Sequence, residues 1–356
     1  MTQHLCQLAS ETMLHLKGAG IANFLQGQLT CDTRELSMFK AIPGALCTPK
    51  GRVLSDVVVI QLTEEHCILR LRRSIAQEVA TSLARYAQFS RISVEVEQSD
   101  ERIVGVIGDL DTPILGTSLI ASTECYGITH GDGILIVRRG RRIAELMSAK
   151  DEAPLQLLFD LTSGNDSAVP SGRAENDSYE GFWQAELLRS GHFAINADDY
   201  ERYTPQALNY DQIGLVSYKK GCYTGQEVIA RQHYKRQSKR TLAVYQTNGE
   251  SLLPGANLFA VAGAATGAVT GKVAASPEGG NTAAVSVPAE ANTCEVMGEP
   301  KVPQGVRVAK VLRVAPTIDG SPLVAAEVGR DHLGEVLEND SGIVLRPVEL
   351  TASSAE

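Results

Sequence analysis

The sequence predicts an α+β fold that ends in a β-barrel and is divided into more than one domain. Three observations support this prediction. The chain has 356 residues, which is more than a single hydrophobic core usually serves. Predicted strands outnumber predicted helices before residue 240, and their mixed order is untypical of a doubly wound parallel sheet. After Thr241 the chain changes to short runs of Val, Ala, Thr and Gly with close turns, which is typical of a small barrel.

The first 150 residues mix strand and helix patterns. Residues 45–62 form a predicted β-hairpin, in which Pro49 and Gly51 fit the second and fourth positions of a type I turn. Apolar residues within 21–29 recur at helical spacing, directly after an alternating strand pattern at 13–17. By the same criteria we expect strands at 67–72, 91–97, 103–108 and 133–137, and helices at 74–86 and 142–147.

The domain boundaries follow from changes in composition. Ser, Gly, Asn and Asp accumulate between residues 161 and 176, which indicates a loop or a domain junction. A helix is expected from Asp177 through Trp183 to the vicinity of Gly191. We therefore divide the chain into an N-terminal α+β region (1–165), its continuation (166–240) and a barrel-like domain (241–356). Strands of the barrel are expected at 241–246, 268–274, 282–287, 306–314, 323–328 and 343–350.

Composition excludes several classes of protein. The formal net charge of −9 argues against a general nucleic-acid coat, which needs a basic balance. The seven cysteines are at least sixteen residues apart, so no local CxxC site is present, no metal site is expected, and reduced cytosolic thiols are indicated. No export signal is recognisable at the N-terminus. The uncharged stretch 251–271 contains Pro, Asn and several Gly, so we expect strands there and no membrane span.

The segment Lys220-Gly-Cys-Tyr-Thr-Gly-Gln-Glu227 carries the densest chemical signal in the chain. Thr224 and Glu227 have the spacing of a capping box at the start of a helix. Cys222 would then lie near a helix N-terminus and beside Lys219 and Lys220, two influences that lower a thiol pKa. The alternative interpretation is a small buried cysteine in a glycine-bounded turn.

This octapeptide, together with Arg231, resembles the signature of the YgfZ family, folate-binding proteins linked to tRNA modification and related to the aminomethyltransferase of glycine cleavage. The segments 24–32 (FLQGQLTCD), 49–52 (PKGR) and 204–209 (TPQALN) resemble other landmarks of that family and occur in the same order. The resemblance covers most of residues 14–242. It implies an aminomethyltransferase-like, multi-domain ring that binds folate in a central channel.

The resemblance also implies a cofactor and its site. Tetrahydrofolate, or a folate derivative, would stack on Trp183, since a flat pteridine gains from contact with an indole. Cys222 and Lys220 are the candidate catalytic residues. The other candidate cofactor-binding residues are Gln28, Gln206, Asn209, Tyr223, Gln226, Glu227 and Arg231.

Some of these assignments have a structural alternative. Trp183 and Leu187 have the spacing of an ordinary core stripe on a helix. Gln206 and Asn209 suit the mixed edge of a heterocycle, and equally suit the fixing of a loop backbone. Where the family has a second aromatic residue facing folate, this chain has Glu11.

Three functions remain open. By resemblance, the first is a cytoplasmic, monomeric folate-binding protein that is not a classical enzyme and supports iron–sulfur proteins such as tRNA methylthiotransferases. The second is a folate-dependent one-carbon transferase, which needs an acid against the folate amine; Asp32 and Asp56 are the candidates. The third is an RNA-binding adaptor using residues 219–240, where seven Lys or Arg accompany one acid and several aromatic residues. Direct tRNA contact is expected to be weak or absent, because the net charge opposes it.

Overall fold

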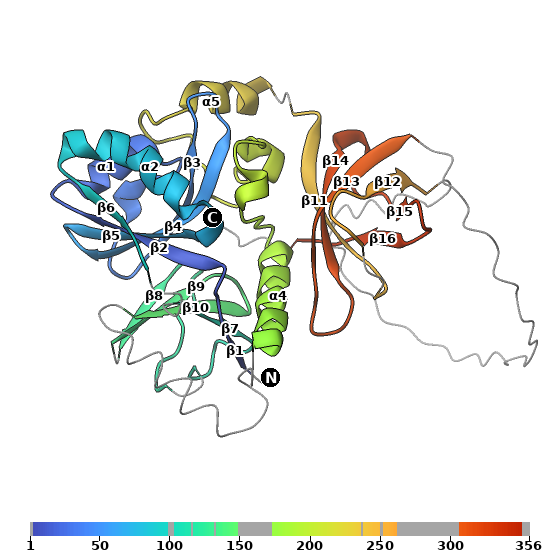
Figure 1. The fold of residues 1–356 in the computed structure, drawn as a ribbon, viewed down its shortest axis with the longest axis horizontal. Coiled ribbons are helices and arrows are strands. Elements are labelled where there is room, and N and C mark those ends of the chain that lie inside the picture. Colours follow the sequence, from blue (N-terminus) through green and yellow to red (C-terminus); the bar gives the residue numbers. More distant parts are fainter. Residues whose placement is uncertain are drawn as a thin grey trace, which may run out of the picture.

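The computed structural model describes residues 3–98, 103–114, 117–131, 133–148, 173–235, 238–249, 252–261 and 306–350. Within these ranges the chain forms two open five-stranded sheets and one closed six-stranded barrel. Figure 1 shows helix α4 (Arg173–Arg189) in the middle, with the open sheets on one side and the barrel on the other. The predicted α+β class with a C-terminal barrel is confirmed.

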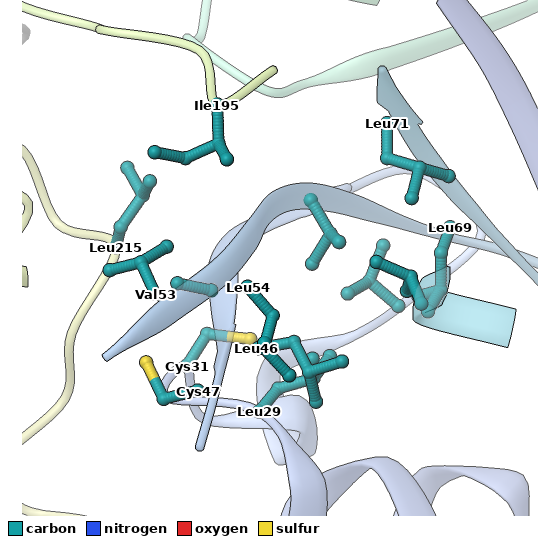
Figure 2. Close-up of a cluster of buried hydrophobic side chains, with 14 of the residues drawn as sticks. Leu29, Cys31, Leu46, Cys47, Val53, Leu54, Leu69, Leu71, Ile195 and Leu215 are labelled. Atoms are coloured by element: carbon teal, nitrogen blue, oxygen red, sulfur yellow. The ribbon is translucent and has the colours of Figure 1, made fainter. Parts of the chain in front are cut away.

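The first sheet contains the predicted hairpin and is entirely antiparallel. Gly51 N donates to Thr48 O at 2.8 Å and closes the predicted turn. Figure 2 shows side chains from this hairpin packed with Leu29 and Cys31, which follow the first helix. The strands, in sheet order, are β3 (Ile42–Cys47), β4 (Val53–Thr63), β5 (His66–Arg72), β2 (Glu11–Lys17) and β6 (Ser93–Val96), accompanied by helices α1 (Ile21–Gln28) and α2 (Ala76–Ala87).

The second sheet corrects one prediction. The segment 142–147 was expected as a helix, but residues 143–147 belong to a strand that lies between two neighbours and is buried along its whole length. Burial on both faces removes the alternation that distinguishes a strand from a helix in sequence. The strands, in sheet order, are β1 (His4–Gln7), β7 (Ile103–Ile107), β10 (Ile143–Ser148), β9 (Ile134–Arg138) and β8 (Ile128–Gly131).

Helix α4 packs against the second sheet and the barrel. It begins at Arg173, so Asp177 lies inside it and the predicted start at Asp177 is wrong. Its end agrees with prediction, because Gly191 follows with a left-handed φ of 80°. The proposed domain junction at residue 165 lies outside the described residues.

The barrel closes in the order β11, β14, β13, β12, β15, β16. Its predicted strands near 241–246, 306–314 and 323–328 are confirmed, whereas those at 268–274 and 282–287 lie outside the described residues. Among the described residues no helix has the length and apolar character to cross a membrane. The strands are β11 (Arg240–Gln246), β12 (Asn257–Ala260), β13 (Arg307–Ala315), β14 (Leu323–Gly329), β15 (Leu337–Asn339) and β16 (Val344–Pro347).

Candidate functional site

Three segments that the sequence singled out meet at one place. The amide of Thr224 donates to Gly27 O at 3.1 Å, which joins the octapeptide to helix α1. Gly225 lies against the hairpin turn with a φ of 84°, and a Cβ atom there would come within 2.5 Å of Thr48 O. Only glycine combines this left-handed backbone with such a close approach. Residues 24–32, 49–52 and 220–227 therefore form one structural unit.

Lys220 holds this unit together. Its ammonium donates to the carbonyl oxygens of Gln26 at 2.6 Å, Leu29 at 2.6 Å and Cys31 at 2.8 Å. These carbonyls lie at the end of α1, where the helix leaves acceptors unsatisfied and where its dipole favours a cation. The side chain is only 5% exposed, and burial lowers the pKa of Lys220 to about 8. All three donors of the Lys220 ammonium are thus used as a helix cap, and its catalytic role stays a prediction.

Cys222 lies in the same loop and is exposed. The capping box predicted after it is absent: helix α5 (Gln226–Lys235) begins two residues beyond Thr224, whose amide is already engaged. The exposed Glu227 carboxylate lies 3.7 Å from the Arg231 guanidinium, one turn along α5. The capping box therefore does not support a reactive Cys222, and the Lys220 ammonium is engaged by backbone carbonyls. Cys222 differs from Cys6, Cys31, Cys47 and Cys67 in that its thiol is accessible to solvent, whereas those four cysteines are buried.

A groove of about 600 Å³ opens beside this loop. Gln28 and Thr224 line one side, together with the turn residues Thr48 and Pro49, and helix α2 lines the other. Tyr223 lies beneath the loop, with its ring 4.8 Å from the Lys220 ammonium. Of the predicted cofactor-binding residues, Gln28 thus faces a cavity, whereas Tyr223 is buried.

Gln206 and Asn209 hold backbone segments in place. Gln206 Nε2 donates to Ile229 O at 2.8 Å and ties its loop to helix α5. Asn209 Nδ2 donates to Leu242 O at 2.9 Å and so reaches the first strand of the barrel. Asn209 also has a left-handed φ of 58°. The geometry favours the structural alternative for both residues.

A second cavity, of about 690 Å³, lies where α4, the end of β5 and the barrel meet. We call it the ring-centre cleft. Arg72 donates to Ser10 Oγ and Gln184 Oε1 at its wall, and Glu180 Oε1 accepts from the Ser10 amide at 3.0 Å. Two buried donors, Arg72 Nε and Gln184 Nε2, have no hydrogen-bond partner in the described structure. The cleft is lined by Ser10, Arg72, Arg73, Ser74, Asp177, Glu180, Gly181, Gln184, Asn196, Ala197, Asp198 and Arg313.

A network of buried charges extends from the cleft into the second sheet. Glu11 lies 3.2 Å from Arg72 and 3.1 Å from Arg70. Glu145 lies 2.5 Å from Arg70 and 2.6 Å from Arg139. The carboxylate of Glu11 is thus the counter-ion of two buried arginines. Sequence reasoning missed these arginines, although charges at alternate positions in the apolar run His66–Arg72 were a usable signal.

Trp183 does not present an open face. The indole is fully buried, and Gly105 of β7 packs against it: a Cβ atom at Gly105 would lie 2.9 Å from the ring. The ring belongs to the core between α4 and the sheets, with Leu187 one turn further along. Stacking of folate on Trp183 stays a prediction, and it requires displacement of these neighbours.

Comparison with known proteins places the chain in a family. No family model matches it. The tRNA-modifying protein YgfZ of Yersinia pseudotuberculosis serotype IB (strain PB1/+) is 31% identical over 241 residues, which are 67% of this chain and 69% of that protein. The chain belongs to the YgfZ family. The Vibrio atlanticus (strain LGP32) protein of the same name is 28% identical over 255 residues, 71% of this chain and 72% of the relative.

The fold extends beyond the YgfZ family. The crystal structure of the glycine cleavage system aminomethyltransferase T from Bartonella henselae superimposes with a TM-score of 0.65 at 15% identity. The match covers 98% of this chain and 86% of that structure. The predicted aminomethyltransferase-like fold is therefore confirmed, and at this identity the likeness concerns the fold alone.

The two aspartates considered for one-carbon transfer are engaged elsewhere in this YgfZ-family chain. Asp56 accepts hydrogen bonds from His192 Nε2 and the Ile195 amide, each at 2.7 Å. Burial alone would raise the pKa of Asp56, but these partners lower it below its usual value. A hydrogen bond from Arg34 likewise lowers the pKa of Asp32. Both carboxylates are thus held ionised by protein groups, which does not suit a proton donor to a folate amine.

Proposed function

We propose that this chain is a folate-binding protein that supports tRNA modification through iron–sulfur enzymes such as the tRNA methylthiotransferases. Its membership of a family whose relatives are named tRNA-modifying proteins supports the tRNA part. The observation that carries the folate part is the ring-centre cleft, where Arg72 Nε and Gln184 Nε2 are buried donors without a partner. A buried donor without an acceptor is unfavourable by about 1–3 kcal/mol, so a ligand acceptor at this point would be stabilising.

The chemistry of the cleft fits a folate. Its volume of about 690 Å³ falls within the range of roughly 300–1,000 Å³ that small-molecule pockets occupy. A pteridine edge carries both acceptors and amino donors. Arg72 and Gln184 suit the acceptors, and the carboxylate of Glu180 suits the donors. Arg313, also at the wall, supplies positive charge for the carboxylates of the glutamate tail. When bound, tetrahydrofolate would supply its reduced ring as a one-carbon carrier.

The loop of Cys222 serves a different purpose in this proposal. Its thiol is exposed, and Lys220 and Gly225 fix the backbone on either side of it. We assign the loop to contact with the iron–sulfur partner, because thiolate is a ligand that iron–sulfur clusters use. In this proposal the cleft holds the cofactor, and the loop presents the exposed thiol of Cys222.

Calorimetric titration with tetrahydrofolate, 5-formyl- and 5,10-methylene-tetrahydrofolate tests the folate part. Gln184→Leu removes the unpartnered donor, so we expect about tenfold weaker binding, the equivalent of one buried hydrogen bond. Gln28→Leu is the matched control, because it makes the same change in the groove beside the Cys222 loop. A loss in Gln28→Leu with none in Gln184→Leu would place folate in that groove and contradict the cleft. If the unmodified protein binds no folate, the proposal fails.

A further inference from the structure

A basic groove lies between the hairpin turn and the start of the barrel. We use this name for the cavity of about 350 Å³ lined by Arg52, Arg202, Lys239 and Arg240. Among the described residues, Glu327 is the one acidic residue at its wall, and it lies 3.6 Å from Arg240. Arg52 extends across the groove and donates to the backbone oxygen of Arg202 at 2.9 Å. The cavity therefore has three more cations than anions.

This surplus is unusual for the chain. Within the described part of the molecule no carboxylate forms an ion pair with Arg52, Arg202 or Lys239. Cations gathered around one cavity repel each other, and the net charge of the whole chain is −9. Such an arrangement is stabilised when an anion enters, because a phosphate accepts charge-assisted hydrogen bonds from several guanidinium groups.

An acceptor-rich pocket of about 220 Å³ adjoins the basic groove and shares Gln232 and Ser238 with it. Three of its lining residues have a buried side-chain oxygen without a hydrogen-bond donor in the described structure: Gln206 Oε1, Asp211 Oδ1 and Gln232 Oε1. His233, also at its wall, stacks on Tyr218 with the ring centroids 3.8 Å apart. Hydrogen-bond donors of a ligand would satisfy the acceptors of this pocket, whereas an anion would compensate the charge of the basic groove.

We propose that the two adjoining pockets bind one ribonucleotide unit. The phosphate would occupy the basic groove, and the ribose hydroxyls and an amino-bearing base would donate to Asp211 and Gln232. A free nucleotide and a residue within an RNA strand share this chemistry. Folate binding requires neither pocket, so the inference goes beyond the proposed function. With so few phosphate contacts, binding to RNA should be no tighter than about 10⁻⁴ to 10⁻⁶ M at physiological salt.

Fluorescence anisotropy with short labelled oligoadenylate and oligouridylate, between 50 and 200 mM salt, tests the inference. The double variant Arg202→Gln/Lys239→Gln removes two cations of the basic groove. Each phosphate contact contributes about 0.7 to the slope of log K against log salt for a single strand. Because the groove is proposed to hold one phosphate, we expect the slope to fall by up to about 0.7. The matched control is Arg141→Gln/Arg346→Gln, which changes the net charge equally at two exposed positions elsewhere and should behave like the unmodified protein.

Competition experiments and one further variant identify the ligand. Competition by AMP supports a nucleotide site, and competition by oligonucleotide alone supports a site for an RNA strand. Asp211→Asn should reduce the preference for adenylate over uridylate. Equal behaviour of the two double variants would overturn the inference. So would equal displacement by a polyglutamate peptide of the same charge, which would indicate an acidic protein partner. Arg202→Gln/Lys239→Gln should keep its folate affinity, so failure here is distinguishable from failure of the proposed function.

Discussion

Two sets of buried cations in the described structure are stabilised by different means. Lys220 has three backbone carbonyls as its hydrogen-bond partners, whereas Arg70, Arg72 and Arg139 have the carboxylates of two glutamates. Neutral carbonyls orient an ammonium without compensating its desolvation, and the pKa of Lys220 accordingly falls to about 8. Burial alone would also lower the pKa of Arg139, but Glu145 raises it above its usual value.

The difference assigns two roles. The arginine–glutamate network joins strands of both open sheets. The Lys220 cap holds the loop that carries Cys222 through neutral carbonyls, which do not offset the burial of the ammonium. We therefore expect the network to dominate global stability, and the cap to control the loop that carries Cys222.

The largest effect should follow from breaking the network. Glu11→Ala leaves Arg70 and Arg72 buried with one counter-ion fewer, and removing one partner of a buried pair usually destabilises by about 3–5 kcal/mol. Urea unfolding measures this change. Glu35→Ala is the control, because its ion pair with Lys40 is exposed and should contribute no more than about 1 kcal/mol. Equal losses of the free energy of unfolding in the two variants would mean that the network does not contribute more to stability than an exposed ion pair.

Removal of the cap should have a smaller effect. Lys220→Met keeps the length of the side chain but leaves three carbonyls without a donor. Since hydrogen bonds to charged groups contribute about 1.5–3 kcal/mol, we expect a loss of that order in the free energy of unfolding at pH 7. The neighbouring Lys219 is exposed, so Lys219→Met should change it by less than about 0.5 kcal/mol. A Lys220→Met variant as stable as Lys219→Met would show that the cap is dispensable.

The stability that the cap contributes should also depend on pH. The pKa of Lys220 is about 8 in the folded chain against a usual value of 10.5. Between these two pH values the unfolded chain binds more protons at this residue than the folded chain does. The free energy of unfolding therefore increases as the pH rises from 8 to 10.5, and it decreases again when the pH is lowered to 8. The stability difference between the unmodified protein and Lys220→Met should widen by up to about 1.4 kcal/mol per pH unit in this window. A difference that stays constant from pH 7 to 10 would contradict the lowered pKa.

A pair of glycines tests the contact between the loop and the hairpin turn. Gly225 and Gly214 have similar left-handed φ values of 84° and 81°, but only Gly225 approaches another backbone segment. Gly214→Ala should therefore cost about 1–2 kcal/mol of backbone strain alone, and Gly225→Ala more than that. Thermal unfolding of both variants gives the comparison. If the two substitutions are equally destabilising, the loop does not depend on the turn.

Part of this structure was predictable from local pattern. The hairpin at 45–62 and three barrel strands follow from alternation and turn residues, which depend on neighbours in sequence. The meeting of the segments 24–32, 49–52 and 220–227 was not predictable from pattern, because it needs the tertiary structure. Lys220 donates a hydrogen bond to Gln26, which is 194 residues away in sequence. The residues next to Lys220 in sequence do not indicate that partner.

The errors have a common physical origin. Strand β10 was predicted as a helix, because a central strand buried on both faces has no alternation and here includes the buried Glu145. The burial of Lys220 and Glu11 was not predictable for a related reason: a charged residue is expected to be exposed unless its buried partner is known. Trp183, by contrast, occupies the core position that its helical spacing indicates.

The most direct test separates the two sites that the proposed function requires. Cys222→Ala and Gln184→Leu are each returned to a strain that lacks the protein, and methylthio-modified tRNA is quantified beside the folate affinity of the purified variants. We predict that Cys222→Ala binds folate normally and fails to restore the modification, because it removes only the exposed thiol of the loop. Gln184→Leu should lose folate affinity about tenfold. Full restoration of tRNA modification by Cys222→Ala would contradict a functional role for the loop.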